Sequence, residues 1–148
     1  MGVSPTGNPG TGSGSAITLP ASVANIEKVI AFLEGELEKR DCPVKTSMQI
    51  CMAADKVMAN IAMSAYAPGS GEMTVQFDYD GTGRTVSVTF TDSGIPFDPL
   101  AKKDPDVGLP AEERKIGGLG IFLVKKTMAE IRYRREDGKN ILCLRKRI

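Results

Sequence analysis

The chain of 148 residues contains no histidine. Without that side chain it cannot, on its own, build a Ser-His-Asp triad, a histidine metal site or a phosphohistidine relay. Any proton transfer therefore falls to carboxylates, lysine, tyrosine, cysteine or water.

Cysteine is also scarce, and its spacing excludes two further classes of protein. The three cysteines, Cys42, Cys51 and Cys143, are far apart and form no Cys-x-x-Cys pair. This pattern argues against a disulfide framework and against a zinc site, and it favours a reducing, cytoplasmic environment.

Long apolar runs and a large excess of charge are absent as well. No apolar run is long enough to span a bilayer, and no charged-then-apolar signal segment opens the chain, so we expect no membrane contact. The net charge of +1 implies no general attraction to nucleic acid. The length and the 41% hydrophobic content fit one globular domain.

The charge is nevertheless uneven along the chain. From Lys125 to the C-terminus, nine basic residues face three acidic ones. Such a region is one route to nucleic-acid binding. However, the charges alternate along expected strands with only Phe122 and Tyr133 as nearby aromatics, which favours a solvated sheet edge or a protein-partner face.

The order of the expected elements predicts the fold class. Residues 1–15 are rich in Gly, Ser and Pro and are predicted to be a disordered tail before a single domain at 16–148. Periodicity and turn signals then predict, in order, a strand at 17–20, helices at 23–37 and 44–66, a hairpin of strands at 73–79 and 85–91, a lid at about 99–116, a helix at 119–129 and a hairpin of strands at 131–135 and 140–146. This order fits an α+β two-layer sandwich, with helices on one face of a mostly antiparallel (mixed) sheet.

The second expected helix carries a polar pair among apolar neighbours. Lys56 and Asn60 are four residues apart and so share a face. The Asn60 side-chain oxygen is the kind of hard ligand that Mg²⁺ accepts beside phosphates and water. The simpler interpretation is an ordinary pair on a helix surface.

Two glycine-bearing segments together predict a nucleotide site. In Asp92-Ser93-Gly94, a carboxylate follows a strand and lies beside a backbone without a side chain. In Gly117-Gly118-Leu119-Gly120, backbone amides can approach an anion where a helix begins. Taken singly, the first is also typical of an Asx turn and the second of a tight loop-to-helix junction.

Taken in order, these segments resemble the boxes of the GHKL (Bergerat-fold) ATPases. Residues 55–61 resemble the N box, 92–99 the G1 box, and 113–124 the lid and the G2 box. The resemblance runs from Ile17 onward and is greatest to the anti-sigma-factor serine kinases of bacterial partner-switching systems. It implies a Bergerat ATP-binding fold, with ATP and Mg²⁺ as ligands.

The resemblance also assigns roles to matching residues. Asn60 matches the Mg²⁺-binding asparagine, and Asp92 matches the aspartate that accepts the adenine amino hydrogen bond. The remaining implied nucleotide contacts are Gly94, Phe97, Arg114, Gly117, Gly118, Leu119 and Gly120, of which Gly118 and Gly120 match the glycines whose amides hold phosphate.

One position departs from the family pattern. Lys56 stands where the family usually carries the glutamate that orients or deprotonates the attacking hydroxyl group. A lysine side chain is a cation at neutral pH and is a poor general base unless it is strongly desolvated. We therefore expect ATP binding to be retained and phosphotransfer to be weakened or lost.

The resemblance implies two alternatives for function. In the first, the chain binds a sigma factor, is released by a STAS-type anti-anti-sigma protein, and phosphorylates that protein on serine or threonine. In the second, it is a nucleotide-dependent protein-binding module without turnover. Relatives are often dimeric, so the helix at 23–37 is a candidate homodimer surface, although its apolar face serves core packing equally well.

Overall fold

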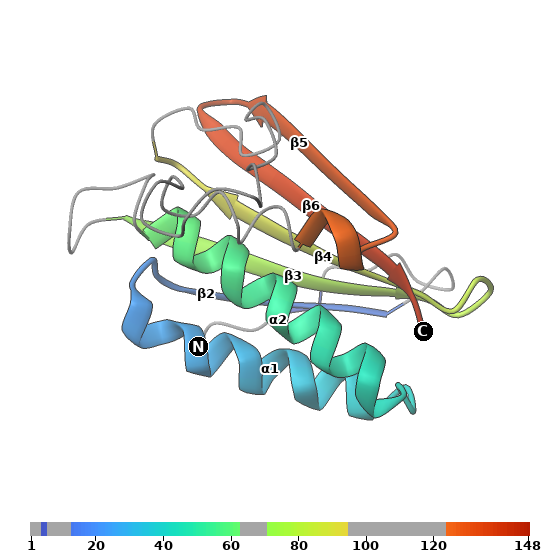
Figure 1. The fold of residues 1–148 in the computed structure, drawn as a ribbon. Coiled ribbons are helices and arrows are strands. Elements are labelled where there is room, and N and C mark those ends of the chain that lie inside the picture. The colour runs from blue at the N-terminus through green and yellow to red at the C-terminus, as the bar shows by residue number, and fades with distance from the viewer. Residues whose placement is uncertain (1–3, 6–12, 63–70, 95–123) are drawn as a thin grey trace, which may run out of the picture.

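The structure is a computed structural model that describes residues 4–5, 13–62, 71–94 and 124–148. In these residues, an antiparallel sheet of six strands carries two long helices on one face (Figure 1). The strands are β1 (Ser4–Pro5), β2 (Ser13–Pro20), β3 (Glu72–Asp80), β4 (Thr85–Asp92), β5 (Glu130–Glu136) and β6 (Lys139–Arg147), in the spatial order β1-β2-β3-β4-β6-β5. The helices are the 3₁₀ turn η1 (Val23–Asn25), α1 (Ile26–Glu38) and α2 (Val44–Asn60). The predicted α+β sandwich is thus confirmed, and every described strand pairing is antiparallel.

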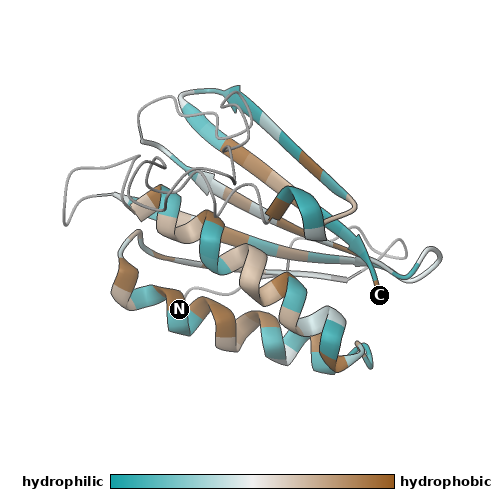
Figure 2. Cartoon of the chain, in the orientation of Figure 1, coloured by the Kyte–Doolittle hydropathy of each residue, from teal (hydrophilic) through white to brown (hydrophobic). Residues whose placement is uncertain are grey.

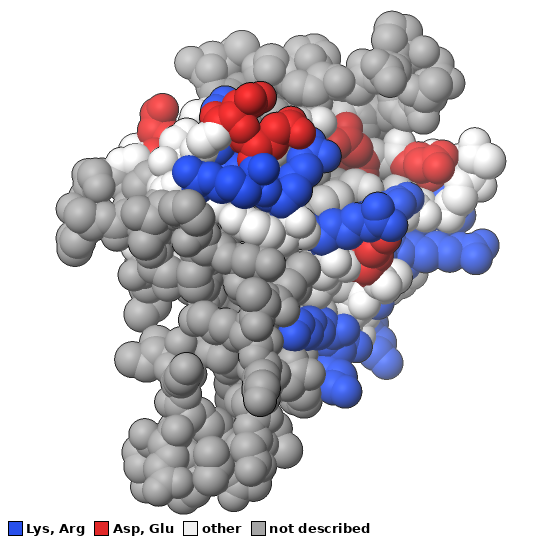
Figure 3. Space-filling view, turned by 90° about the horizontal axis from the view of Figure 1, so that it is seen from above, with Lys and Arg blue, Asp and Glu red and all other residues white. Residues whose placement is uncertain are grey.

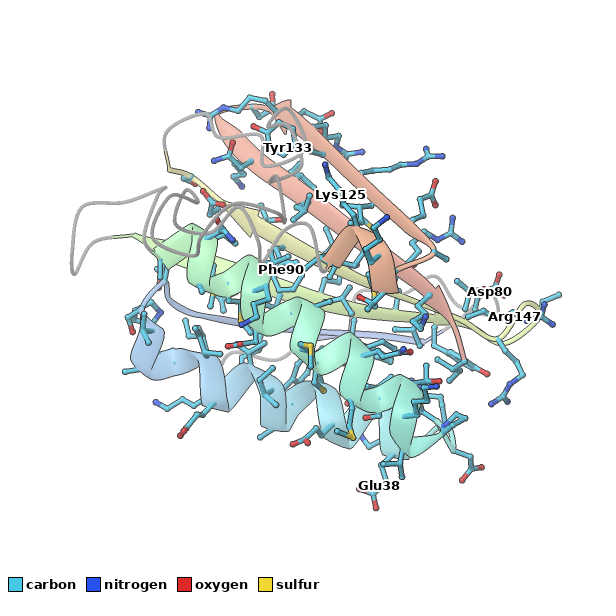
Figure 4. The ribbon with its side chains drawn as sticks, viewed as in Figure 1. Glu38, Asp80, Phe90, Lys125, Tyr133 and Arg147 are labelled. Atoms are coloured by element: carbon cyan, nitrogen blue, oxygen red, sulfur yellow. The ribbon has the colours of Figure 1, made fainter. Side chains whose placement is uncertain are left out.

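The alternating sequence of β3 and β4 produces the inner face of the sheet. Alternate side chains of both strands are buried, and Phe77 and Phe90 are each at most 1% exposed. Figure 4 shows Phe90 on the sheet beside α2, and Figure 2 shows hydrophobic residues running through the middle of β6, with hydrophilic ones toward its ends. The core therefore lies between the sheet and the helices.

The second hairpin has the turn that its sequence predicts. Asp137 and Gly138 connect β5 to β6, with φ values of 51° and 74°. Two consecutive residues with positive φ match the right-handed twist of a hairpin, and an Asp-Gly pair tolerates this conformation. This turn places Arg135 opposite Asn140.

Both long helices bury one apolar face, as the predicted periodicity requires. Val29, Leu33 and Leu37 of α1 and Ala54 and Val57 of α2 are at most 1% exposed. Val23, the first residue of the predicted helix, is 62% exposed and lies in the 3₁₀ turn before α1. The first helix thus begins later than predicted, and α2 is described to Asn60, followed by a π-helical turn at 61–62.

The N-terminal strand is longer than predicted. Ser13 pairs with Tyr79, and Ser4–Pro5 pairs with residues 15–16. The expectation of disorder was therefore wrong for residues 4–5 and 13–15, and the rest of the 1–15 segment lies outside the described residues. Strand pairing uses backbone groups, so the edge of β3 can order a segment that has few apolar side chains.

The helix expected at 119–129 is described only in part. Residues 124–127 are helical, and the Met128 N–H donates to the Val124 carbonyl group at 3.0 Å. The helix ends there because the Ala129 N–H donates instead to Arg145 of β6. The start of this helix and the lid at about 99–116 lie outside the described residues.

The described helices do not have the length and apolar character that crossing a membrane requires. The three cysteines are free thiols in the structure. Within the described residues, no cluster of three or more His, Cys, Asp or Glu side chains is arranged to hold a metal ion.

Cys51 on α2 is expected to make the stability of the fold decrease at alkaline pH. Burial raises the pKa of its thiol from 9.0 to about 11; the charge of Glu34 adds to the rise, and a hydrogen bond with Ser47 opposes it. Between pH 9 and 11 the Cys51 thiol loses its proton in the unfolded chain but keeps it in the folded protein. The folded state then binds more protons, so stability falls as the pH rises.

We therefore expect the free energy of unfolding, measured by urea denaturation, to fall between pH 9 and 11. Cys51→Ala should flatten this dependence, and Cys143→Ala on β6 should leave it unchanged. An equally steep fall in Cys51→Ala would show that other groups control the alkaline transition.

Candidate nucleotide-binding site

Asp92 is the last residue of β4 and is buried, with 4% of its surface exposed. The strand register places it between Met73 of β3 and Asn140 of β6. A buried carboxylate is costly unless it is hydrogen-bonded, so its partners determine what this position can do.

One oxygen of the Asp92 carboxylate accepts both of its hydrogen bonds. The Gly94 N–H donates to Oδ1 at 2.9 Å, and the Asn140 Nδ2 donates to the same oxygen at 3.0 Å. The first bond is the Asx turn that the sequence allowed. Among the described residues, Oδ2 receives no hydrogen bond, so this oxygen is left to accept a donor from a ligand.

Three side chains of the second hairpin hold this turn in place. Tyr133 Oη donates to Asn140 Oδ1 at 2.5 Å, and Arg135 Nη1 donates to the same oxygen at 3.2 Å. The same Arg135 nitrogen donates to the Gly94 carbonyl group at 2.8 Å. The hairpin thus fixes both the Asn140 amide orientation and the backbone that follows Asp92.

Asn140, Tyr133 and Arg135 are not among the site residues predicted from the sequence. The Asp-Gly turn predicts that Arg135 lies opposite Asn140. Their approach to Asp92 depends on the pairing of β4 with β6, which joins residues 48 positions apart. No local sequence pattern predicts the register of β4 with β6.

Asn60 lies at the C-terminal end of α2, with its side chain oriented by its own helix. Its Nδ2 donates to the Lys56 carbonyl group at 2.9 Å. This bond engages the amide nitrogen and leaves the side-chain oxygen as a ligand for a hard cation. A Mg²⁺ ion bound by this oxygen would keep phosphate and water among its other ligands, as Mg²⁺ commonly does in nucleotide sites.

The C-terminal end of α2 and the end of β4 lie at the same end of the sheet (Figure 1). The structure therefore brings Asp92 and Gly94 together and places Asn60 at the same end of the domain. The other predicted contacts lie outside the described residues: Phe97, Arg114, Gly117, Gly118, Leu119 and Gly120.

Lys56 is half-buried on α2, one turn before Asn60. Its Nζ lies 3.8 Å from Asp55 Oδ2, and the two side chains are 39% and 45% exposed. An ion pair this exposed contributes little stability, so Lys56 can adopt other positions. As a cation it can pair with a phosphate group, and it supplies no carboxylate base.

Comparison with known proteins decides the family. The profile of the histidine kinase-like ATPase domain matches residues 19–146. The chain belongs to this family. The matched range contains every predicted site residue and the hydrogen-bonded network around Asp92 that the structure adds.

Two relatives of this histidine kinase-like ATPase domain are named as protein kinases. The serine/threonine-protein kinase BtrW of Bordetella bronchiseptica is 30% identical over 95 residues, which cover 64% of this chain and 66% of BtrW. The serine-protein kinase RsbW of Listeria monocytogenes is 25% identical over 132 residues, covering 85% of this chain and 82% of RsbW.

A solved structure shares the fold. The histidine kinase domain of the blue-light-activated histidine kinase from Erythrobacter litoralis EL346 superimposes with a TM-score of 0.50 at 17% identity. The match covers 86% of this chain and 61% of that chain. At this identity the likeness shows the ATPase-domain fold alone.

The Asn140 network predicts a stability effect in this ATPase domain. Asn140→Ala removes one of the two donors to the buried Asp92 carboxylate and the acceptor that Tyr133 and Arg135 share. We expect a loss of about 1–3 kcal/mol in the free energy of unfolding, measured by urea denaturation.

Lys139→Ala is the control because Lys139 is the exposed neighbour of Asn140. It should change the free energy of unfolding by less than about 0.5 kcal/mol. Equal effects of the two substitutions would mean that the network contributes no net stability.

Proposed function

We propose that this domain binds ATP through Asp92 and uses the bound nucleotide to control its binding to protein partners. The observation that carries the proposal is the buried Asp92 carboxylate, whose Oδ1 accepts two hydrogen bonds and whose Oδ2 accepts none from the described residues. A carboxylate fixed in this way recognises a base that presents an amino donor, as adenine does.

Each site residue then has a defined task. Asp92 Oδ2 accepts the hydrogen bond of the adenine amino group, and the Asn140 amide holds the carboxylate in position. Gly94 allows the base to lie against the backbone. The Asn60 oxygen contributes one Mg²⁺ ligand, and that ion, when bound, would neutralise phosphate charge. Gly118 and Gly120 are proposed to hold the phosphates through their amides.

We further propose cytoplasmic partners of the kind used in partner switching: a sigma factor and a STAS-type anti-anti-sigma protein. The relationship to BtrW and RsbW supports a protein substrate with a serine or threonine acceptor. The solvent side of α2 adds support, because Val44, Met48 and Met52 are 76%, 63% and 51% exposed. Exposed apolar residues repeated every four positions on a helix are typical of a protein-binding face.

A second candidate is a nucleotide-dependent binding module without turnover. Lys56 favours it, because this side chain pairs with Asp55 and places a cation where catalysis by this family uses a carboxylate. In this alternative, ATP and ADP shift the domain between states of different partner affinity.

The test is the affinity of the purified chain for a STAS-domain protein and for a sigma factor, measured by fluorescence anisotropy without nucleotide, with ATP and with ADP. We expect the nucleotide to change at least one affinity several-fold. Affinities that are the same in all three conditions would reject nucleotide control. A nucleotide effect without phosphate transfer would favour the binding module.

A further inference from the structure

The outer face of the sheet, opposite the helices, has a depression beside its β5 edge. Its volume is about 380 Å³. Thr89 of β4 and Ile141 and Cys143 of β6 form its floor, and β5 contributes Arg132, Tyr133 and Arg134. The strand register agrees, because Cys143 lies between Thr89 and Arg132.

The alternation of β5 separates this depression from the nucleotide site. Tyr133 and Arg135 form the hydrogen bonds to Asn140 on the inner side of the sheet. Arg132 and Arg134 have the opposite side-chain direction and are exposed. The two arginines therefore have no part in the network around Asp92.

Both arginines can bind a carboxylate from another molecule. Their side chains are 78% and 66% exposed, and their Nε atoms lie 2.5 Å from Glu130 and 4.0 Å from Glu136, respectively. Among the described residues, their terminal nitrogens make no hydrogen bond. Exposed ion pairs contribute little stability, so an incoming carboxylate can compete with these glutamates. A guanidinium group binds a carboxylate through two parallel hydrogen bonds.

The spacing of the arginines indicates the form of the ligand. Two residues along a strand advance about 6.6–6.8 Å, which is also the repeat of alternate side chains in an extended peptide. We propose that this depression, which we call the β5 groove, binds an extended segment of a partner protein with acidic side chains at alternating positions. Ile141 and Cys143 provide a mainly apolar floor beneath it.

A protein segment fits better than a nucleic acid. Lys and Arg side chains gather over the β5–β6 side of the sheet, but Asp and Glu side chains lie among them (Figure 3). Glu130 and Glu136 repel any anion, so this surface of mixed charge suits separate carboxylates spaced by neutral side chains better than the continuous charge of a phosphate backbone. Single-stranded nucleic acids also need aromatic side chains for stacking, and the hydroxyl group of Tyr133 is bonded to Asn140 on the inner side.

The proposal is tested with the full chain labelled with ¹⁵N and the synthetic peptide acetyl-Glu-Val-Glu-Val-Glu-amide. We expect amide shifts at residues 132–134 and 141–143 on titration. Arg132→Gln/Arg134→Gln should weaken binding roughly tenfold or more. Lys28→Gln/Lys45→Gln, with the same loss of charge on exposed helix positions, should change binding less than about twofold.

Other outcomes would overturn the proposal. Amide shifts that occur only outside the β5 groove would mean that the peptide binds elsewhere. An equal loss of peptide affinity in the two double variants would mean that the peptide is bound by nonspecific charge attraction. Tighter binding of a thymidine oligonucleotide than of the peptide at the same salt concentration would assign the surface to nucleic acid. The proposal does not rest on nucleotide binding, and the arginine variant should retain ATP affinity if the domain binds ATP.

Discussion

Asp92→Asn is expected to abolish measurable ATP binding while the domain stays folded. The new side chain can still accept from Asn140 and from the Gly94 N–H through its oxygen. Its amide nitrogen then replaces Oδ2 and turns a donor toward the adenine amino group. A lost charged hydrogen bond and an unpaired donor together cost several kcal/mol, so affinity should fall roughly 100-fold or more.

Asp80→Asn is a matched control for this substitution. Asp80 also ends a strand, and its Oδ1 accepts the Thr82 N–H at 3.0 Å in the same turn geometry. It lies beside the β3–β4 loop, away from the labelled Tyr133 of the network (Figure 4). Isothermal calorimetry should give normal ATP binding for Asp80→Asn. Normal binding in Asp92→Asn as well would show that the open Asp92 oxygen is not the base acceptor.

The second large effect is expected from Lys56→Glu. This change places a carboxylate one helical turn before Asn60, where it can orient or deprotonate a serine hydroxyl group of a partner. General-base catalysis contributes about 10²–10⁴-fold, so transfer of phosphate from ATP to a STAS-domain protein should rise by a factor in this range. Radiolabelled ATP and a single-turnover measurement would report the rate of transfer.

Two further variants separate the causes of such an increase. Lys56→Gln removes the cation without adding a base, and Lys45→Glu makes the same charge change at an exposed position on α2. Only Lys56→Glu should reach the fast rate. If it is no faster than Lys56→Gln while ATP still binds, the domain lacks more than the base, and the binding-module alternative is favoured.

The sequence predicts the elements well where a local pattern determines them. Alternation in β3 and β4 and the apolar period of α2 each act within one segment, so these elements could be predicted from the sequence. The strand at Ser13 was missed because its order comes from the edge of β3. The first helix was expected to begin at residue 23, but a 3₁₀ turn at Val23–Asn25 precedes α1 and the Ser22 side chain makes no capping hydrogen bond.

The candidate site, too, was predictable only where a local motif determines its residues. Asp92, Gly94 and Asn60 could be proposed from local motifs and the family resemblance, which also gave the ATP-binding hypothesis. The positions of Asn140, Tyr133 and Arg135 relative to Asp92 depend on pairing between strands that are distant in sequence. Physical reasoning from one segment at a time cannot supply that register.

The most direct test of the account is calorimetric titration of the chain with ATP, ADP and GTP, with and without Mg²⁺. The account predicts a dissociation constant on the order of micromolar for the adenine nucleotides, little binding of GTP, and tighter ATP binding when Mg²⁺ is present. Absence of heat with all three nucleotides, or equal binding of ATP and GTP, would contradict an adenine site at Asp92.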